Sequence, residues 1–204
     1  MKKKLLSIAL AACMLLLPVG STALAAQEEA AFQPGDVPAA SSAAEAMLPA
    51  IHGVVLAVLN HETGSFDLDN GVLAWEGLYN MLSLYGQLDS RSSSDNGELF
   101  LPEETVQDYA SALKVDVDAL PPLPAELRDR INYDNVSRCY VIFRGEDDQA
   151  RIQVDDACHA GGVLILTGSL VYEVDGQVLT QFQATLQPQD NMFGWAVTAL
   201  TVTG

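Results

Sequence analysis

Two cysteines, Cys139 and Cys158, are the first candidates for a chemical role, because they could form a disulfide bond. Cys139 and Cys158 lie in two segments that alternate apolar and polar residues, with a polar loop at 147–150 between them. If this loop centres a hairpin, the two cysteines lie directly opposite each other and share a face. A disulfide there would close a loop of about 18 residues and stabilise the fold by ~3 kcal/mol. A register shift of two residues would instead separate the sulfurs and leave two buried thiols.

The histidines give little support to nucleophilic or metal chemistry. A cysteine nucleophile needs a histidine base within hydrogen-bond reach, and His159 directly follows Cys158. Neighbouring residues of a strand point to opposite faces, so this pair is badly arranged for catalysis. His52 and His61 fall about half a turn out of phase on a helix, and the sequence has neither H-E-x-x-H nor C-x-x-C.

Acidic residues are abundant, at 27 Asp and Glu, but their pattern defines no site. The stretch from Asp67 begins like an EF-hand calcium loop, yet Gly71 and Leu78 stand where two calcium ligands are needed. Carboxylate pairs for hydrolysis can come from anywhere in a chain, so their presence discriminates nothing. We therefore predict no catalytic residue, no metal ligand and no cofactor.

Four aromatic residues could line a pocket between helices and a curled sheet: Trp75, Tyr79, Phe182 and Trp195. A domain of this size also needs large apolar side chains to fill its core. We favour the interpretation that these residues belong to the core, and a pocket lined by them is the alternative.

Composition limits the class of protein. The chain has 204 residues, a formal net charge of −17 and a hydrophobic fraction of 49%. Such a length suits one domain with a tail, and the apolar content excludes a wholly disordered acidic polymer. The acidic balance argues against binding to nucleic acid or to anionic membrane surfaces, since both require clustered basic residues.

The first 25 residues are typical of a secretory signal peptide. Three lysines at 2–4 precede the apolar run 5–17, and Ala23-Leu24-Ala25 offers a site for cleavage between Ala25 and Ala26. Removing this segment removes three of the ten basic residues and none of the acidic ones, so the mature chain is more acidic still.

An alternative targeting signal begins at Leu10, where Leu10-Ala11-Ala12-Cys13 is similar to a bacterial lipobox. Cleavage there would leave Cys13 as a lipid-anchored N-terminus at the cell surface. After signal removal, we expect no segment with the ~20 apolar residues that a transmembrane helix requires.

Beyond the signal, the pattern predicts a flexible linker and one domain. Residues 26–45 are rich in Ala, Pro and Ser and would form the linker, followed by a single α+β domain at 46–204. Helical periodicity predicts three helices: one starting near Pro49, one at 72–85 capped by Asp69 or Asn70, and one starting at Pro102. The stretch 114–135 contains three prolines and reads as an extended connector.

From residue 136 the period changes to two, which predicts strands. The expected strands follow in order at 138–144, 152–158, 162–174, 178–186 and 192–202, with Asp175-Gly176 as a hairpin turn. Helices followed by strands indicate an α+β fold, with the N-terminal helices packed on one face of a curled antiparallel sheet of four to five strands.

This order of elements resembles the NTF2/cystatin-like roll. The segments AWEGLYNMLSLYG, LPEETVQDYASAL, LPPLP and YDN resemble uncharacterised secreted proteins of Gram-positive bacteria, over roughly residues 47–204. That resemblance implies secretion and a fold, but it implies no activity. The inhibitory loop of the cystatins, Q-x-V-x-G, is absent, so protease inhibition does not follow.

The sequence therefore predicts a secreted, non-enzymatic domain that binds an unknown extracellular partner. Two alternatives remain: a roll whose concave sheet face holds a small ligand or substrate, and a lipid-anchored accessory protein.

Overall fold

The computed structural model describes residues 37–144 and 149–203. The expected signal peptide with its cleavage pair Ala25 and Ala26, the lipobox Cys13 and linker residues 26–36 lie outside the described residues.

The described chain contains helices, two antiparallel sheets and three short 3₁₀ turns, in an α+β arrangement as predicted. The helices are α1 (Val37–Asn60), α2 (Gly71–Tyr85) and α3 (Glu103–Ser111). The first sheet has the order β1 (Ser65–Phe66), β9 (Trp195–Thr203), β8 (Val178–Pro188), β7 (Val163–Tyr172), β6 (Ala150–Ala160). The second has the order β2 (Ser93–Asp95), β3 (Glu98–Pro102), β5 (Cys139–Phe143), β4 (Ile131–Asp134). The 3₁₀ turns are η1 (Gly86–Leu88), η2 (Val117–Ala119) and η3 (Ala125–Leu127).

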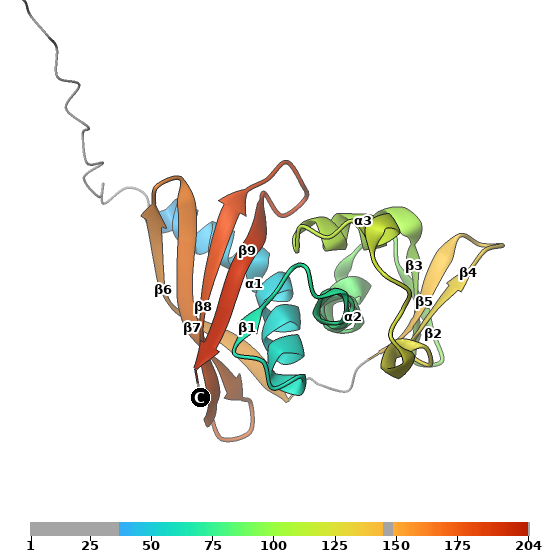
Figure 1. The fold of residues 1–204 in the computed structure, drawn as a ribbon, viewed down its shortest axis with the longest axis horizontal. Helices are drawn as coiled ribbons and strands as arrows, with labels where there is room; N and C mark the ends of the chain where they lie inside the picture. Colours follow the sequence, from blue (N-terminus) through green and yellow to red (C-terminus); the bar gives the residue numbers. More distant parts are fainter. Residues whose placement is uncertain (1–36, 145–148, 204) are drawn as a thin grey trace, which may run out of the picture. The chain divides into compact units, whose positions relative to one another are not determined.

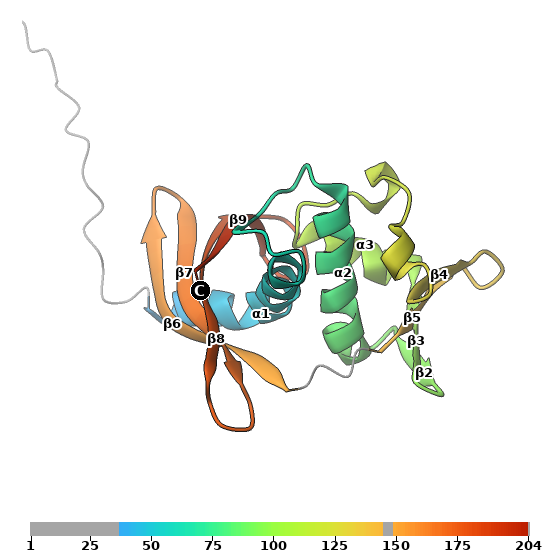
Figure 2. The same ribbon diagram turned by 60° about the horizontal axis from the view of Figure 1, so that its bottom comes forward.

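The elements from α1 onwards form layers (Figures 1 and 2). The five-stranded sheet packs against α1, α1 packs against α2, and α2 and α3 pack against the four-stranded sheet. Two helices therefore lie between two open sheets, and each sheet buries one face against a helix.

Helix α1 begins at Val37, well before the start expected near Pro49, so the prediction of a linker through residue 45 is wrong for its last part. The alanines that suggested a linker are strong helix formers, and Ala40, Ala43 and Ala44 are buried in the core. Pro49 lies inside the helix, where its ring removes one backbone hydrogen bond.

The 21-residue stretch 40–60 is also long and apolar enough to span a membrane by length and composition alone, contrary to the expectation that no segment after the signal would be. In the fold it is a core helix, because Met47, Ile51 and Val54 are fully buried between the five-stranded sheet and α2.

Helices α1 and α2 cross at Gly53. A Cβ atom at this position would lie 2.5 Å from the carbonyl oxygen of Gly77 and 2.9 Å from the backbone nitrogen of Met81. The Asn80 side chain donates a 3.2 Å hydrogen bond to the Gly53 carbonyl oxygen within the same buried contact. A glycine inside a helix costs free energy, and the close approach of the two backbones explains why it stands here.

Helix α2 begins as predicted. The side-chain oxygen of Asn70 accepts hydrogen bonds from the backbone N–H groups of Val72 and Leu73, which otherwise have no partner in the first turn. Of the two candidate caps, Asn70 takes this role.

The expected hairpin between the two cysteine-bearing segments does not form. Strand β5 pairs with β3 and β4, whereas β6 pairs with β7 in the other sheet. The single sheet that was expected is therefore two sheets, and β4 lies within the stretch 114–135 that was expected to be an extended connector. Alternation of apolar and polar residues indicates that a segment is a strand, but it does not determine which other strand pairs with it.

We predict that Gly53→Ala destabilises the protein. The added methyl group collides with the backbone of α2, and an overpacked core costs about 1–3 kcal/mol, which exceeds the roughly 1 kcal/mol gained in helix propensity. Because the added Cβ atom meets backbone atoms and not a flexible side chain, we expect a cost near the upper end of that range and a net loss of about 2 kcal/mol in the free energy of unfolding, measured by urea denaturation.

Gly64→Ala is the matched control, because nothing lies within 4 Å of its added Cβ atom. Its free energy of unfolding should stay within about 0.5 kcal/mol of the wild type. Equal stability of the two variants would contradict the close helix crossing.

Candidate functional site

The aromatic candidates do not gather into one pocket. Trp75 and Tyr79 lie on α2, whereas Phe182 and Trp195 lie on β8 and β9. The first three are buried, at 7%, 6% and 4% exposure, and Trp195 is partly exposed with its ring centroid 5.9 Å from that of His159. Three of the four thus contribute to the core.

Trp75 and Tyr79 attach α2 to the segments that follow it. The Trp75 indole N–H donates a 2.8 Å hydrogen bond to the carbonyl oxygen of Pro121, and the Tyr79 hydroxyl donates one of 3.2 Å to the carbonyl oxygen of Phe143. Burial raises the pKa of the Tyr79 phenol, while the nearby Arg130 acts to lower it. The two aromatic residues therefore hold the connector and β5 in place.

Phe182 packs on the helix-facing side of the five-stranded sheet, opposite Gly168 on β7. A Cβ atom at Gly168 would lie 2.7 Å from the Phe182 ring, so the ring covers the glycine. Helix α1 covers the same side of the sheet, where Leu166 and Ala184 are fully buried. The sheet face on which a roll would hold a ligand is therefore filled by the core.

Cys139 and Cys158 are both free thiols and lie in different sheets. Cys139 is opposite Pro102 and Asp134, and Cys158 is opposite Ile165. The possible cross-strand disulfide does not form, because the hairpin that it required is absent, and the alternative of two buried thiols is also wrong, because Cys158 is exposed and Cys139 is half-buried.

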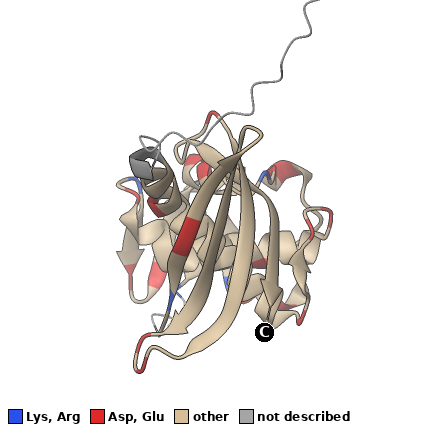
Figure 3. Ribbon diagram, turned by 90° about the vertical axis from the view of Figure 1, so that its left-hand side faces the viewer, with Lys and Arg blue, Asp and Glu red and all other residues tan. Residues whose placement is uncertain are grey.

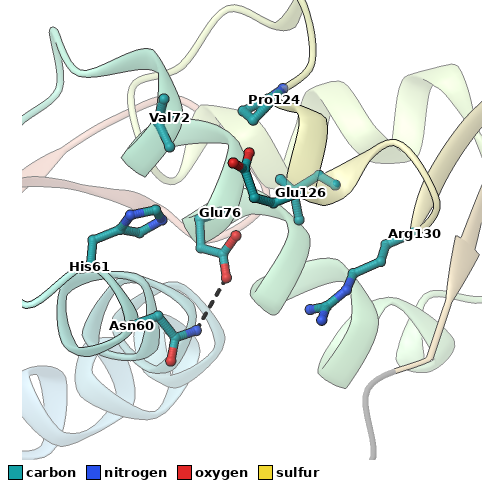
Figure 4. A pocket seen from close by; sticks show the side chains of 8 residues that line it. Asn60, His61, Val72, Glu76, Pro124, Glu126 and Arg130 are labelled. Carbon is teal, nitrogen blue, oxygen red and sulfur yellow. Dashed lines mark hydrogen bonds between the residues drawn. The ribbon is translucent and has the colours of Figure 1, made fainter.

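A polar cavity of about 400 Å³ lies where the end of α1, the first half of α2 and the connector around η3 meet (Figure 4). Its lining comprises Asn60, His61, Val72, Glu76, Pro124, Glu126, Leu127 and Arg130. Figure 4 shows His61, Glu76 and Glu126 around one end of this space and Arg130 beyond them. This cavity unites a buried carboxylate with exposed charged groups.

Glu76 is the buried group of the cavity. It is 8% exposed, and one carboxylate oxygen accepts a 3.1 Å hydrogen bond from the Asn60 side-chain amide. Arg130 also lines the cavity, but its guanidinium lies over the Tyr79 ring, 5.6 Å from the ring centroid. In the part of the chain that the structure describes, no ion pair joins Glu76 to a basic side chain.

The outer face of the five-stranded sheet is a second candidate surface (Figure 3). Strands β7, β8 and β9 contain 10, 11 and 9 residues, and none of these is charged. Next to a row formed by Ile165, Thr185 and Ala199, six polar side chains on this face lie opposite one another in two rows: Thr167, Gln183 and Thr201, then Gln181, Thr203 and Ser169, which is 4% exposed. We call these six residues the hydroxyl–amide grid.

A shallow hollow of about 370 Å³ lies on the hydroxyl–amide grid and includes five of its six residues. Asp155 of β6, an extra residue at a β-bulge, borders the hollow. Its carboxylate accepts hydrogen bonds from the Gln153 side-chain amide at 3.1 Å and the Ser169 hydroxyl at 3.4 Å. The bulge therefore turns a carboxylate toward the edge of an otherwise uncharged surface.

Within residues 37–144 and 149–203, no three His, Cys, Asp or Glu side chains are grouped closely enough to hold a metal ion. His52, His61 and His159 are separated in the fold. His52 is buried and its Nδ1 lies 2.8 Å from the Tyr85 hydroxyl oxygen, His61 borders the polar cavity, and His159 lies beside Trp195.

Sequence reasoning missed both surfaces. Glu76 is enclosed by the apolar stripe of α2, and only the folding of the connector onto that helix makes a cavity there. The grid left a readable signal, since Thr and Gln alternate with apolar residues at 181–185 in a stretch without charges.

No protein-family model matches the sequence, and no curated protein sequence matches it. The resemblances to the NTF2/cystatin-like roll and to secreted Gram-positive proteins therefore stay predictions.

We predict that both thiols react with Ellman's reagent without prior reduction. Cys158 is exposed and Cys139 is half-buried, so Cys158 should react faster. Cys158→Ser should remove one fast-reacting thiol, whereas Cys139→Ser should leave that fast reaction in place. A requirement for reductant before either thiol reacts would contradict the separation of the two cysteines.

Proposed function

We propose that this protein is a secreted, non-enzymatic binding module that holds a neutral polysaccharide on the outer face of its five-stranded sheet. The observation that carries the proposal is the hydroxyl–amide grid, an uncharged polar surface on a chain with a formal net charge of −17.

The absence of charge on β7, β8 and β9 matters because charged side chains are common on exposed sheet faces. Acidic residues make up most of the charge of this chain and surround the grid on other elements (Figure 3). Such a field repels anionic polymers, whereas an uncharged ligand approaches without an electrostatic cost. A neutral partner therefore fits this face better than an anionic one.

The side chains of the grid have the hydrogen-bonding capacity that a carbohydrate requires. A glutamine amide offers two donors and an acceptor, and a threonine hydroxyl both donates and accepts, as the hydroxyl groups of a sugar do. Gln181 and Gln183 lie in the middle strand with a hydroxyl residue on each side, at strand spacings of about 4.8 Å. Successive sugar units would thus meet similar groups along the face.

Binding without conversion is the simpler role for this surface. Hydrolysis of a glycosidic bond requires two carboxyl groups on opposite sides of that bond. Asp155 is the one acid among the residues that line the hollow in the described part of the chain. Hydroxyl and amide groups can hold a sugar, but they do not supply general acid–base catalysis at neutral pH.

We predict that replacing Gln181 and Gln183 together by Ala weakens polysaccharide binding about tenfold or more, since each lost hydrogen bond costs about 1 kcal/mol. Affinity electrophoresis in gels that contain a neutral glucan or mannan measures this change as a loss of retardation. Gln87→Ala is the matched control, because Gln87 is an exposed glutamine of η1, outside the grid.

The proposal also sets the outcomes that contradict it. Equal retardation of the wild type and the double variant would show that the hydroxyl–amide grid does not bind the polysaccharide. Retardation by anionic polygalacturonate but by no neutral polymer would overturn the ligand class, and self-association through the grid in light scattering would replace the ligand by a second copy of the chain.

For the localisation of the protein, we propose secretion after cleavage between Ala25 and Ala26. Mass spectrometry of the mature N-terminus should find Ala26 as the first residue. An acylated Cys13 at the N-terminus would instead establish the lipid-anchored form.

A further inference from the structure

The polar cavity beside α2 is independent of the hydroxyl–amide grid. It is formed by the end of α1, by α2 and by the connector, whereas the grid belongs to β7, β8 and β9. At about 400 Å³ it falls at the small end of the range that small-molecule sites occupy.

Within the described residues, the Glu76 carboxylate has one hydrogen-bond partner, and its other oxygen keeps access to the cavity. A charged group removed from water is unfavourable unless another charge or several hydrogen bonds replace the water. Glu76 is 8% exposed and receives one hydrogen bond, from the neutral amide of Asn60. Its second oxygen is not among the buried side-chain atoms without a partner in the described residues, so a ligand in the cavity can reach it.

The positive group that lines the cavity does not neutralise Glu76. The Arg130 guanidinium lies over the ring of Tyr79, which follows Glu76 by about one turn of α2. Arg130 forms no ion pair with Glu76. Glu126 brings a second carboxylate to the cavity rim, on the same side as Glu76 in Figure 4. The end of the cavity near Glu76 is therefore anionic and open to a ligand.

We propose that this cavity binds a small organic amine through its primary ammonium group, which Glu76 receives at the buried end and Glu126 receives at the rim. An ammonium group carries three donors and a full positive charge, and so suits two carboxylates with the His61 ring nearby. A bound metal ion fits less well, because no group of three metal-binding side chains occurs in the described residues.

Two kinds of ligand share this ammonium chemistry. A diamine would use the carboxylate end alone, whereas a free amino acid would also place its own carboxylate toward Arg130 at the other end of the cavity. Putrescine and L-lysine represent these two kinds, and butyrate is an anion that should not bind.

The test is calorimetric titration of the secreted chain with each probe at millimolar concentration. Putrescine or L-lysine should bind, and Glu76→Gln should weaken the binding at least tenfold. The Gln side chain keeps an oxygen that can accept the hydrogen bond from Asn60 but removes the charge. Tighter binding of L-lysine, diminished by Arg130→Gln, would identify the amino-acid kind.

Glu104→Gln is the matched control, since Glu104 is an exposed glutamate of α3 outside the cavity, and its binding should equal that of the wild type. If Glu76→Gln does not fold, as judged by circular dichroism, Glu126→Gln serves in its place, because that exposed side chain can be changed without disturbing the core. A several-fold weakening is expected for it.

Three results would overturn the inference: no binding of either amine, equal binding by the wild type and the Glu76 variant, or butyrate binding as tight as that of putrescine. Because the grid variant Gln181→Ala/Gln183→Ala leaves the cavity unchanged, amine binding by that variant should equal that of the wild type.

Discussion

The contact between Gly53 and Gly77 is the constraint on which the other layers depend. It brings α1 and α2 so close that a single Cβ atom at Gly53 would meet backbone atoms of the other helix, and Asn80 closes the contact with a hydrogen bond to the Gly53 carbonyl. With the helices joined in this way, each has a further apolar side to bury. The five-stranded sheet covers α1, and the four-stranded sheet covers α2 (Figure 1).

Both candidate surfaces follow from that helix pair. Helix α1 covers the face of the five-stranded sheet that carries buried leucine, alanine and Phe182 side chains. The opposite face is left to solvent and carries hydroxyl and amide groups. On the other side, Trp75 and Tyr79 bind the connector and β5 to α2, and the space between connector and helix becomes the cavity beside Glu76. The same aromatic residues that build the core thus shape one of the two candidate surfaces.

Local signals explain how much of this could be predicted from sequence. The cap at Asn70 and the turn at Asp175-Gly176 are formed by neighbouring residues, so α2 and the β7–β8 hairpin were predicted correctly. The pairing of β5 and β6 depends on distant segments, and alternation alone made them resemble one hairpin. The start of α1 was missed because a run of alanines suits a helix only when a sheet is present to bury it. Glu76 was missed for a similar reason, since the connector that encloses it is distant in sequence.

The strong negative charge of the chain acts differently on the two surfaces. A ligand with an ammonium group is attracted by the field of an acidic protein before it reaches Glu76, and dissolved salt screens that attraction over a Debye length of about 8 Å. A neutral polysaccharide experiences no such attraction, and its hydrogen bonds to Gln181 and Gln183 depend little on ionic strength. The acidity of the chain is therefore compatible with both proposed ligands, because one is positively charged and the other is uncharged. Rising salt concentration should separate them, since it weakens the cavity's affinity while leaving that of the sheet face nearly constant.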